Sequence, residues 1–341
     1  MREKDPMELA MNLADDRLRL TLFMTSNMSL THWDRSGILE RELELYKRLG
    51  KHAVEVGIVS YGGSQDRDYF SRFSEIKILC NRWNLPSRVY KRLIPWVHAP
   101  WLRASDVFKS NQLLGAEIAA QAARIWRKPF IARCGYLQSQ FLAHTIGADA
   151  EVTDTAIRTE NDILDSASKI IVATPAMARS VSERIEDGDM KTAVVPNYVD
   201  IDLFRPAVET DTDIDVLFVG RLAPQKNVAE FLAAIASTDL NVMVIGDGEL
   251  SEHVIHMKER LNGRLQWLPR IPNSKLPEIM QRSGLFILPS VWEGHPKTLI
   301  EAMASGLPVI ASDIPGHREV VKHGVTGWLC GTSASSIARA M

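Results

Sequence analysis

Residues 289–313 read PSVWEGHPKTLIEAMASGLPVIASD, and this stretch decides the fold of the carboxyl half. The run just before it, GLFILPS (residues 284–290), is short and apolar and ends in Pro and Ser, which is typical of a buried strand. Pro296 suits the first helical position, residues 297–305 favour a helix, and Gly306 suits its carboxyl-terminal cap. The stretch therefore predicts a strand, a loop, a helix and a second strand in succession.

Two glutamates mark this stretch as a candidate site. Glu293 falls in the loop after the strand, and Glu301 falls about one turn into the predicted helix. The first amides of that helix, near His295 to Thr298, lack intrahelical acceptors and are suited to binding a phosphate. The carboxylates would accept hydrogen bonds from sugar hydroxyls. Spacing alone also fits a surface loop with an incidental acidic pair.

A second strand and loop, DVLFVGRLAPQKN (residues 215–227), places two cations before a helix. Gly220 ends the strand, Arg221 and Lys226 lie in the loop, and the helix begins near Val228. An arginine offers a planar fork and a lysine a mobile point charge, so the pair is suited to a pyrophosphate. Two solvated surface cations would give the same pattern. A GDG turn (residues 246–248) lies between the two loops and predicts a tight strand-to-helix turn.

Together these motifs resemble the carboxyl-terminal domain of retaining glycosyltransferases of family 4, which have the GT-B fold. The resemblance is close over residues 191–328 and looser before them. It implies that Arg221 and Lys226 bind the diphosphate, that Glu293 holds hydroxyls of the transferred sugar, and that these three residues are catalytic. It also implies that Glu301 binds the ribose diol. The remaining donor-binding residues that it implies are Gly220, His295, Pro296, Lys297, Thr298, Leu299, Arg270 and Ile271.

The bulk composition is that of a globular protein with two domains. The chain has 341 residues, 45% of them hydrophobic and 24% charged, with a net charge of −2. That charge argues against nucleic acid as a partner. Three widely spaced cysteines indicate neither a disulfide framework nor a zinc cluster. The first residues are too charged for a secretory signal, and no apolar run is long enough to span a membrane. We therefore expect a cytoplasmic protein, with peripheral contact at the inner face of a membrane left open.

Apolar strand candidates alternate with helical stretches along the whole chain, which predicts doubly wound parallel sheets. The prediction is an α/β GT-B architecture of two Rossmann-like domains facing a cleft. We expect an amino-terminal acceptor-side domain over 1–196, a linker over 197–206 and a nucleotide-sugar-binding domain over 207–341. The predicted strands are 18–24, 52–61, 75–80, 106–110, 129–135, 169–174, 192–197, 215–220, 240–248, 264–269, 285–290 and 308–312. The predicted helices are 34–49, 86–95, 111–126, 153–167, 175–187, 228–237, 249–261, 275–283 and 297–305.

The amino half departs from the family pattern at two loops. Family members often have a glycine-rich loop after the first strand, where this chain has only Gly37, and Asp34 suits either a helix cap or a site role. Many have a histidine where this chain reads Arg133 and Cys134. We therefore expect Gly37 and Arg133 on the acceptor side. No general base is assigned; His32 and His98 are the alternatives.

Two further features bear on function. Residues 82–109 mix six Lys/Arg with aromatic side chains, which fits either an anionic membrane surface or a helix with a basic face and buried aromatics. After Trp328 the chain ends sooner than in the family, so we expect a fragment or a naturally shortened protein.

The expected function is metal-independent, cofactor-free transfer of a sugar from a nucleotide-sugar to a hydroxyl of a saccharide or lipid-linked acceptor, with retention. The alternatives are a nucleotide-sugar hydrolase or epimerase, and a degenerate nucleotide-binding protein without activity.

Overall fold

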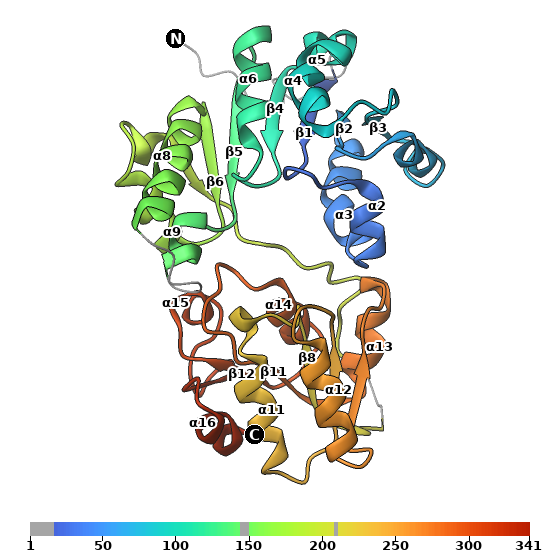
Figure 1. Cartoon of the computed structure of the whole chain (residues 1–341), viewed down its shortest axis with the longest axis vertical. Helices are drawn as coiled ribbons and strands as arrows, with labels where there is room; N and C mark the ends of the chain where they lie inside the picture. The colour runs from blue at the N-terminus through green and yellow to red at the C-terminus, as the bar shows by residue number, and fades with distance from the viewer. Residues whose placement is uncertain (1–16, 144–149, 208–210) are drawn as a thin grey trace, which may run out of the picture. The chain divides into compact units, whose positions relative to one another are not determined.

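The computed structural model describes residues 17–143, 150–207 and 211–341. The chain divides into two compact units, each with its own parallel sheet (Figure 1). The first unit contains the described residues up to Leu137 together with Ala156–Val172 and Ala178–Ala193. The second contains the described parts of Gln138–Thr155, then Ala173–Met177 and Val194–Met341.

The first unit is built on a seven-stranded sheet in the order β3-β2-β1-β4-β5-β6-β7. β1 pairs in parallel with β2 on one side and with β4 on the other, so the chain winds outward in both directions from the β1/β4 boundary. All seven predicted strands are confirmed, with ends shifted by up to three residues. They are β1 (Leu18–Phe23), β2 (Val54–Val59), β3 (Ile76–Leu79), β4 (Val107–Ser110), β5 (Phe130–Cys134), β6 (Lys169–Val172) and β7 (Thr192–Val194).

Helices connect these strands, and three of the predicted helices have wrong bounds; the one predicted over 175–187 ends at Ser182. The stretch predicted as one helix over 34–49 forms two helices, because Gly37 adopts a left-handed backbone with φ 71° that ends the first of them. The helix predicted over 111–126 begins five residues later, after Gly115 with φ 91°. The helices are α2 (Leu30–Arg35), α3 (Leu39–Gly50), η1 (Ser64–Ser71), α4 (Ser87–Val97), α5 (Ala99–Ala104), α6 (Ala116–Trp126), α7 (Gln138–Phe141), α8 (Ala150–Ser166), α9 (Pro175–Ser182) and α10 (Gly188–Lys191).

The start of α2 is held by a carboxylate from another part of the chain. The Asp66 side chain is fully buried and accepts hydrogen bonds from the backbone amides of Leu30 at 3.0 Å and Thr31 at 3.2 Å. It also accepts from the hydroxyls of Thr31, at 2.6 Å, and Ser60. A carboxylate at a helix amino terminus is favoured by the helix dipole. The Asp66 carboxylate therefore binds the first amides at the amino terminus of α2.

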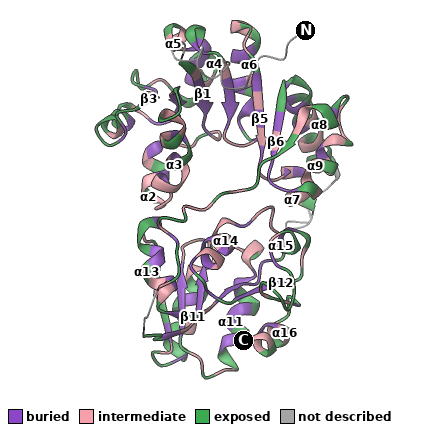
Figure 2. Ribbon diagram, turned by 180° about the vertical axis from the view of Figure 1, so that it is seen from behind, coloured by how far each residue is buried: buried purple, intermediate pink, exposed green. Residues whose placement is uncertain are grey.

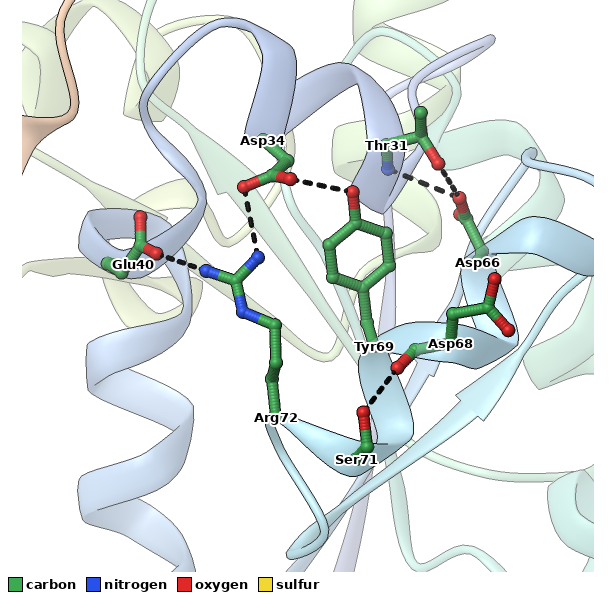
Figure 3. A network of polar contacts seen from close by, with 8 residues as sticks. All are labelled: Thr31, Asp34, Glu40, Asp66, Asp68, Tyr69, Ser71 and Arg72. Atoms are coloured by element: carbon green, nitrogen blue, oxygen red, sulfur yellow. Dashed lines mark hydrogen bonds and ion pairs between the residues drawn. The ribbon is translucent and has the colours of Figure 1, made fainter.

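Asp34 is not the helix cap. It lies inside α2, whose N-cap is Ser29, and its carboxylate accepts from Tyr69 Oη at 2.9 Å and from Arg72 Nη1 at 3.2 Å (Figure 3). The Arg72 guanidinium also pairs with Glu40 on α3 at 2.5 Å. These contacts join α2, α3 and η1 on the surface of the first unit.

The second unit has a six-stranded sheet in the order β10-β9-β8-β11-β12-β13. β8 pairs in parallel with both β9 and β11. The five strands and four helices predicted here are confirmed; β13, α15 and the short helices η3 and η4 are additional, and the chain ends in α16. The elements are β8 (Ile214–Val219), η3 (Pro224–Lys226), α11 (Val228–Ala236), β9 (Val242–Ile245), α12 (Ser251–Arg260), β10 (Leu265–Leu268), η4 (Asn273–Lys275), α13 (Leu276–Gln281), β11 (Ser283–Leu288), α14 (Lys297–Ala304), β12 (Val309–Ser312), α15 (Pro315–Arg318), β13 (Trp328–Cys330) and α16 (Ala334–Ala340).

Apolar side chains on the strands form the core of each unit. Figure 2 shows the central strands in the colour of buried residues and the outward helix faces in that of exposed ones. In the second unit the rings of Phe218 on β8 and Phe231 on α11 stack with centroids 5.3 Å apart. Strands covered on both faces need continuous apolar runs, which is what the sequence of both halves supplies. The predicted doubly wound α/β class is confirmed for both units.

Candidate active site

The candidate site lies at the point of the second sheet where the direction of winding reverses. β8 and β11 are neighbours there: the chain moves from β8 outward to β9 and β10, then returns to β11 and continues on the other side. Loops at the carboxyl ends of two such strands diverge and leave room for a ligand. The loop after β8 carries Arg221 and Lys226, and the loop after β11 carries Glu293.

The structure brings two of the predicted catalytic residues into direct contact. The Lys226 ammonium forms a short ion pair with the Glu293 carboxylate, and the Ser290 hydroxyl donates to the same carboxylate oxygen at 2.7 Å. The side chains of Lys226 and Glu293 are only 16% and 9% exposed. The pair is thus largely shielded, and each charge is neutralised by the other in the free protein.

Backbone contacts fix the two loops against each other. Gln225 donates through its side chain to Trp292 O at 2.8 Å and accepts through its carbonyl from Val291 N at 2.9 Å. On the other side of the glutamate loop, a Cβ at Gly316 would lie 2.1 Å from the Glu293 carbonyl oxygen, so only glycine permits this approach. Lys226 and Glu293 are therefore held on a rigid frame rather than on free loops.

The imidazole of His317, on α15, lies beneath the glutamate loop. It is fully buried, and its Nδ1 lies 2.8 Å from Ser312 O, which makes Nδ1 the protonated nitrogen. No hydrogen-bond partner for Nε2 exists among the described residues. Burial lowers the pKa of His317 to about 4; the Glu293 carboxylate opposes this shift and the Lys226 ammonium adds to it. Sequence reasoning missed this residue, although it follows β12 at the same sheet edge.

Acid should destabilise the second unit through His317. Its folded pKa of about 4 lies below the ordinary value of 6.5, so the unfolded chain binds the proton first and the stabilisation is lost as pH falls from 6.5 to 4. The loss should approach roughly 3 kcal/mol over that window. Urea unfolding at several pH values checks this: His317→Asn should flatten the profile, whereas His253→Gln, on an exposed part of α12, should leave it unchanged. An unaltered slope in the His317 variant would contradict the assignment.

Among the described residues, no side chain caps the amino terminus of α14. Pro296 is the N-cap residue and the helix begins at Lys297, so the prediction of Pro296 at the first helical position is wrong by one residue. Pro296 has no N–H, and within the described chain the amides of Thr298 and Leu299 have no acceptor, which keeps them suited to an anion. The Leu299 side chain is fully buried, so that residue offers only its amide. The His295 carbonyl accepts from Asn197 Nδ2 at 2.6 Å, which holds the approach to the helix.

Glu301 lies deeper than the other predicted site residues. Its side chain is 2% exposed, and Oε1 accepts from Asn273 Nδ2 at 3.1 Å. Asn273, on η4, is a positioning residue that sequence reasoning missed. Gly306 closes α14 as predicted, with φ 81° and its N–H bonded to Met303 O at 3.1 Å.

The GDG turn lies close against the loop after β8. A Cβ at Gly246 would lie 1.8 Å from Gly220 O, and one at Gly248 would lie 2.5 Å from Leu222 O. Leu222 also bonds Asp247 O through its N–H at 3.0 Å. Both glycines are therefore required by close backbone approach, as the tight-turn prediction implies. Gly220 itself has ordinary space for a Cβ, with its nearest neighbour at 3.4 Å.

The remaining residues predicted to bind the donor, Arg221, Arg270 and Ile271, lie at the rim of the candidate site. Arg221 is exposed, and no hydrogen bond or ion pair of its side chain occurs with the described residues. Arg270 is ion-paired with Asp247 at 2.7 Å, so it reaches the GDG turn. Ile271 packs against the core of this unit and stays partly exposed.

The predicted acceptor-side residues belong to the first unit. Gly37 forms the turn between α2 and α3, and Arg133 lies on β5 with its N–H bonded to Ser110 Oγ at 3.0 Å. His98 is buried, with Nε2 at 2.8 Å from Tyr90 Oη, and burial lowers its pKa to about 4. The His98 ring is thus buried and hydrogen-bonded in the core of the first unit, which argues against His98 as the general base. His32 lies on α2.

The described residues offer neither a metal-binding cluster nor a membrane-spanning helix. Across the described ranges, no cluster of three His, Cys, Asp or Glu side chains has the spacing to hold a metal ion. Within those same ranges, no helix is both long and apolar enough to cross a bilayer.

The chain is similar to known glycosyltransferases in sequence. Residues 200–341 match the model of the family described as Glycosyl transferases group 1. A UDP-Gal:alpha-D-GlcNAc-diphosphoundecaprenol alpha-1,3-galactosyltransferase of Escherichia coli is 36% identical over 165 residues, which are 41% of each chain. A D-inositol 3-phosphate glycosyltransferase of Corynebacterium diphtheriae is 25% identical over 66% of this chain and 58% of its own length. The matches thus span less than two thirds of these relatives.

Solved structures agree with the fold over nearly the whole chain. Sucrose-phosphate synthase from Thermosynechococcus elongatus matches with a TM-score of 0.76 at 18% identity, over 95% of this chain and 88% of that one. Anabaena HepE in complex with UDP and glucose matches with a TM-score of 0.73 at 17% identity, over 94% and 88%. The chain therefore has the GT-B fold, and its residues 200–341 match the Glycosyl transferases group 1 family.

Proposed function

We propose that this protein transfers a sugar from a nucleoside diphosphate donor to an acceptor hydroxyl with retention of anomeric configuration. The observation that carries the proposal is the contact of Lys226 with Glu293 at the winding reversal of the second sheet, beside the uncapped start of α14. A cation, a carboxylate and free amides on one rigid frame match the parts of a nucleotide sugar: its phosphates and its sugar hydroxyls.

In this proposal the charge of the leaving diphosphate is neutralised by Arg221, Lys226 and the amides of Thr298 and Leu299. The bond from the anomeric carbon to the phosphate oxygen breaks, and the acceptor oxygen bonds to the same face. The acceptor proton passes to the leaving phosphate oxygen. Glu293 orients the sugar. Because protein groups perform the neutralisation, transfer should continue in EDTA, and this assay tests the metal-independent part of the proposal.

The acceptor class is proposed from the relatives. One is named for transfer to a diphosphoundecaprenol-linked sugar, and others are named for transfer to an inositol phosphate. We propose a saccharide or lipid-linked acceptor in glycan or glycolipid synthesis, used by a cytoplasmic enzyme. The test is a thermal-shift screen of nucleotide sugars followed by product analysis with and without such acceptors. Free sugar or an isomerised donor alone would favour a hydrolase or epimerase, and binding without turnover would favour a protein that only binds nucleotide.

Glu301→Gln should weaken binding of ribonucleotides more than that of their 2′,3′-dideoxy analogues. A carboxylate accepting from the ribose diol loses a charged acceptor in this change, and hydrogen bonds to charged groups contribute about 1.5–3 kcal/mol. Calorimetry with both ligands measures the difference. Asn273→Ala, which removes the Oε1 partner, is the control for mispositioning. Equal losses for the two ligands would remove Glu301 from the ribose site.

A further inference from the structure

Helix α4 in the first unit carries an exposed apolar stripe. Val89, Leu93 and Trp96 are 42%, 37% and 56% exposed and lie at i, i+4 and i+7, so they share one face. Tyr90 and Ile94 on the opposite face are buried. α4 therefore has two apolar faces: one packs in the core, and the other stays exposed in the described part of the chain, where Trp126 contacts only Trp96 at its end.

Positive charge lies beside this stripe and predominates in the flanking sequence. Exposed Arg88 and Arg92 lie on the same side of α4. Between Glu75 and Asp106 the sequence contains no acidic residue, and its basic residues are Lys77, Arg82, Arg88, Lys91, Arg92 and Arg103. This local excess contrasts with the net charge of −2 of the whole chain.

The neighbouring helix α6 extends the same surface. α4 and α6 lie side by side in both views (Figures 1 and 2). The rings of Trp96 and Trp126 meet edge to face with centroids 5.8 Å apart, and Trp126 Nε1 donates to Pro95 O at 3.1 Å. The end of α6 adds Arg124, Arg127 and Lys128. Trp96 is thus braced in an outward position rather than free to fold back.

We propose that the face formed by Val89, Leu93, Trp96, Arg88 and Arg92 docks on the surface of a bilayer that contains anionic lipids. Tryptophan and leucine suit the boundary between headgroups and acyl chains, and the arginine heads reach the phosphates while their stems cover apolar surface. The charge is complementary to such a leaflet. A nucleic-acid surface would not explain the aliphatic stripe. The inference goes beyond the proposed function and stands without it.

Co-sedimentation with phosphatidylcholine vesicles, with and without 30 mol% phosphatidylglycerol (about a third of the lipid, enough for a negative surface), tests the proposal. We expect binding only to the anionic vesicles. Arg88→Gln/Arg92→Gln should lower the partition coefficient about 25-fold, at about fivefold per arginine. Leu93→Ser/Trp96→Ser should lower it by about tenfold or more.

Matched controls lie on α12 of the second unit. Lys258→Gln/Arg260→Gln makes the same change in charge, and Ile255→Ser removes an aliphatic side chain that is 41% exposed. Both should bind vesicles like the unaltered protein, and thermal unfolding should be alike for all variants. Equal binding to neutral and anionic vesicles, or unchanged binding by the α4 variants, would overturn the proposal. So would loss of a dimer, or loss of RNA binding in a mobility-shift assay, as the only effect of these variants.

Discussion

Replacing Glu293 by alanine is expected to lower sugar transfer by about 100-fold or more, because misplacing reacting atoms by even 1 Å has that effect. The affinity for the nucleoside diphosphate product should hold or rise. Glu293 neutralises Lys226 in the free protein, so its removal frees the ammonium for a phosphate. Turnover should thus fall without any loss of product affinity, which a general loss of structure would not produce.

Turnover by coupled assay and product affinity by calorimetry check this expectation. Glu293→Gln keeps an oxygen acceptor for the Ser290 hydroxyl, so this variant separates the effect of side-chain shape on turnover from the effect of its charge. Glu252→Gln, on an exposed part of α12, is the matched control and should leave both values unchanged. Normal turnover in the Glu293→Ala variant would show that this residue is not part of the site. The fold assignment would then hold, but the proposed mechanism would not.

Replacing Arg221 or Lys226 by alanine should weaken nucleoside diphosphate binding by roughly tenfold to 150-fold and leave a bare nucleoside almost unaffected. Each change removes a charge-assisted contact of about 1.5–3 kcal/mol. Arg221 is exposed, so its loss should not alter the free protein, whereas loss of Lys226 also strips the partner from Glu293. Lys226→Ala should therefore lower the melting temperature as well.

Titration calorimetry with the nucleoside and its diphosphate measures both effects. Arg260→Ala removes an exposed arginine from the end of α12 and should bind both ligands normally. Equal losses for nucleoside and diphosphate in the Arg221 variant would mean that the loop after β8 does not face the phosphates.

Local patterns in the sequence were sufficient to predict every described strand except β13, and most of the helices. Continuous apolar runs such as residues 215–220 and 285–290 can only be buried as central strands, and their spacing places the functional loops at one sheet edge. The predictions failed where a single backbone angle decided the outcome. Gly37 broke a helix that helix-forming neighbours favoured on both sides.

Long-range polar contacts could not be read from the chain. Asp66 lies 35 residues from Thr31, whose amide it binds at the start of α2, and nothing near either segment indicates the pairing. The ion pair of Lys226 with Glu293 spans 67 residues; the sequence placed both at the site but not in contact. His317 follows β12 and Asn273 follows β10, so the rule that ligands bind at the carboxyl ends of parallel strands would have found both residues if it had been applied to every strand.

The loops of the second unit are joined largely through main-chain atoms: Gly246 against Gly220, Gly248 against Leu222, and Gly316 against Glu293. Such contacts do not depend on which side chains stand between the glycines. Exposed residues such as Arg221 and Arg270 can therefore be exchanged without reshaping the frame that displays them. Under the proposed function, single substitutions at these rim positions would change the donor preference, whereas a substitution at one of the glycines would remove the frame for every donor alike.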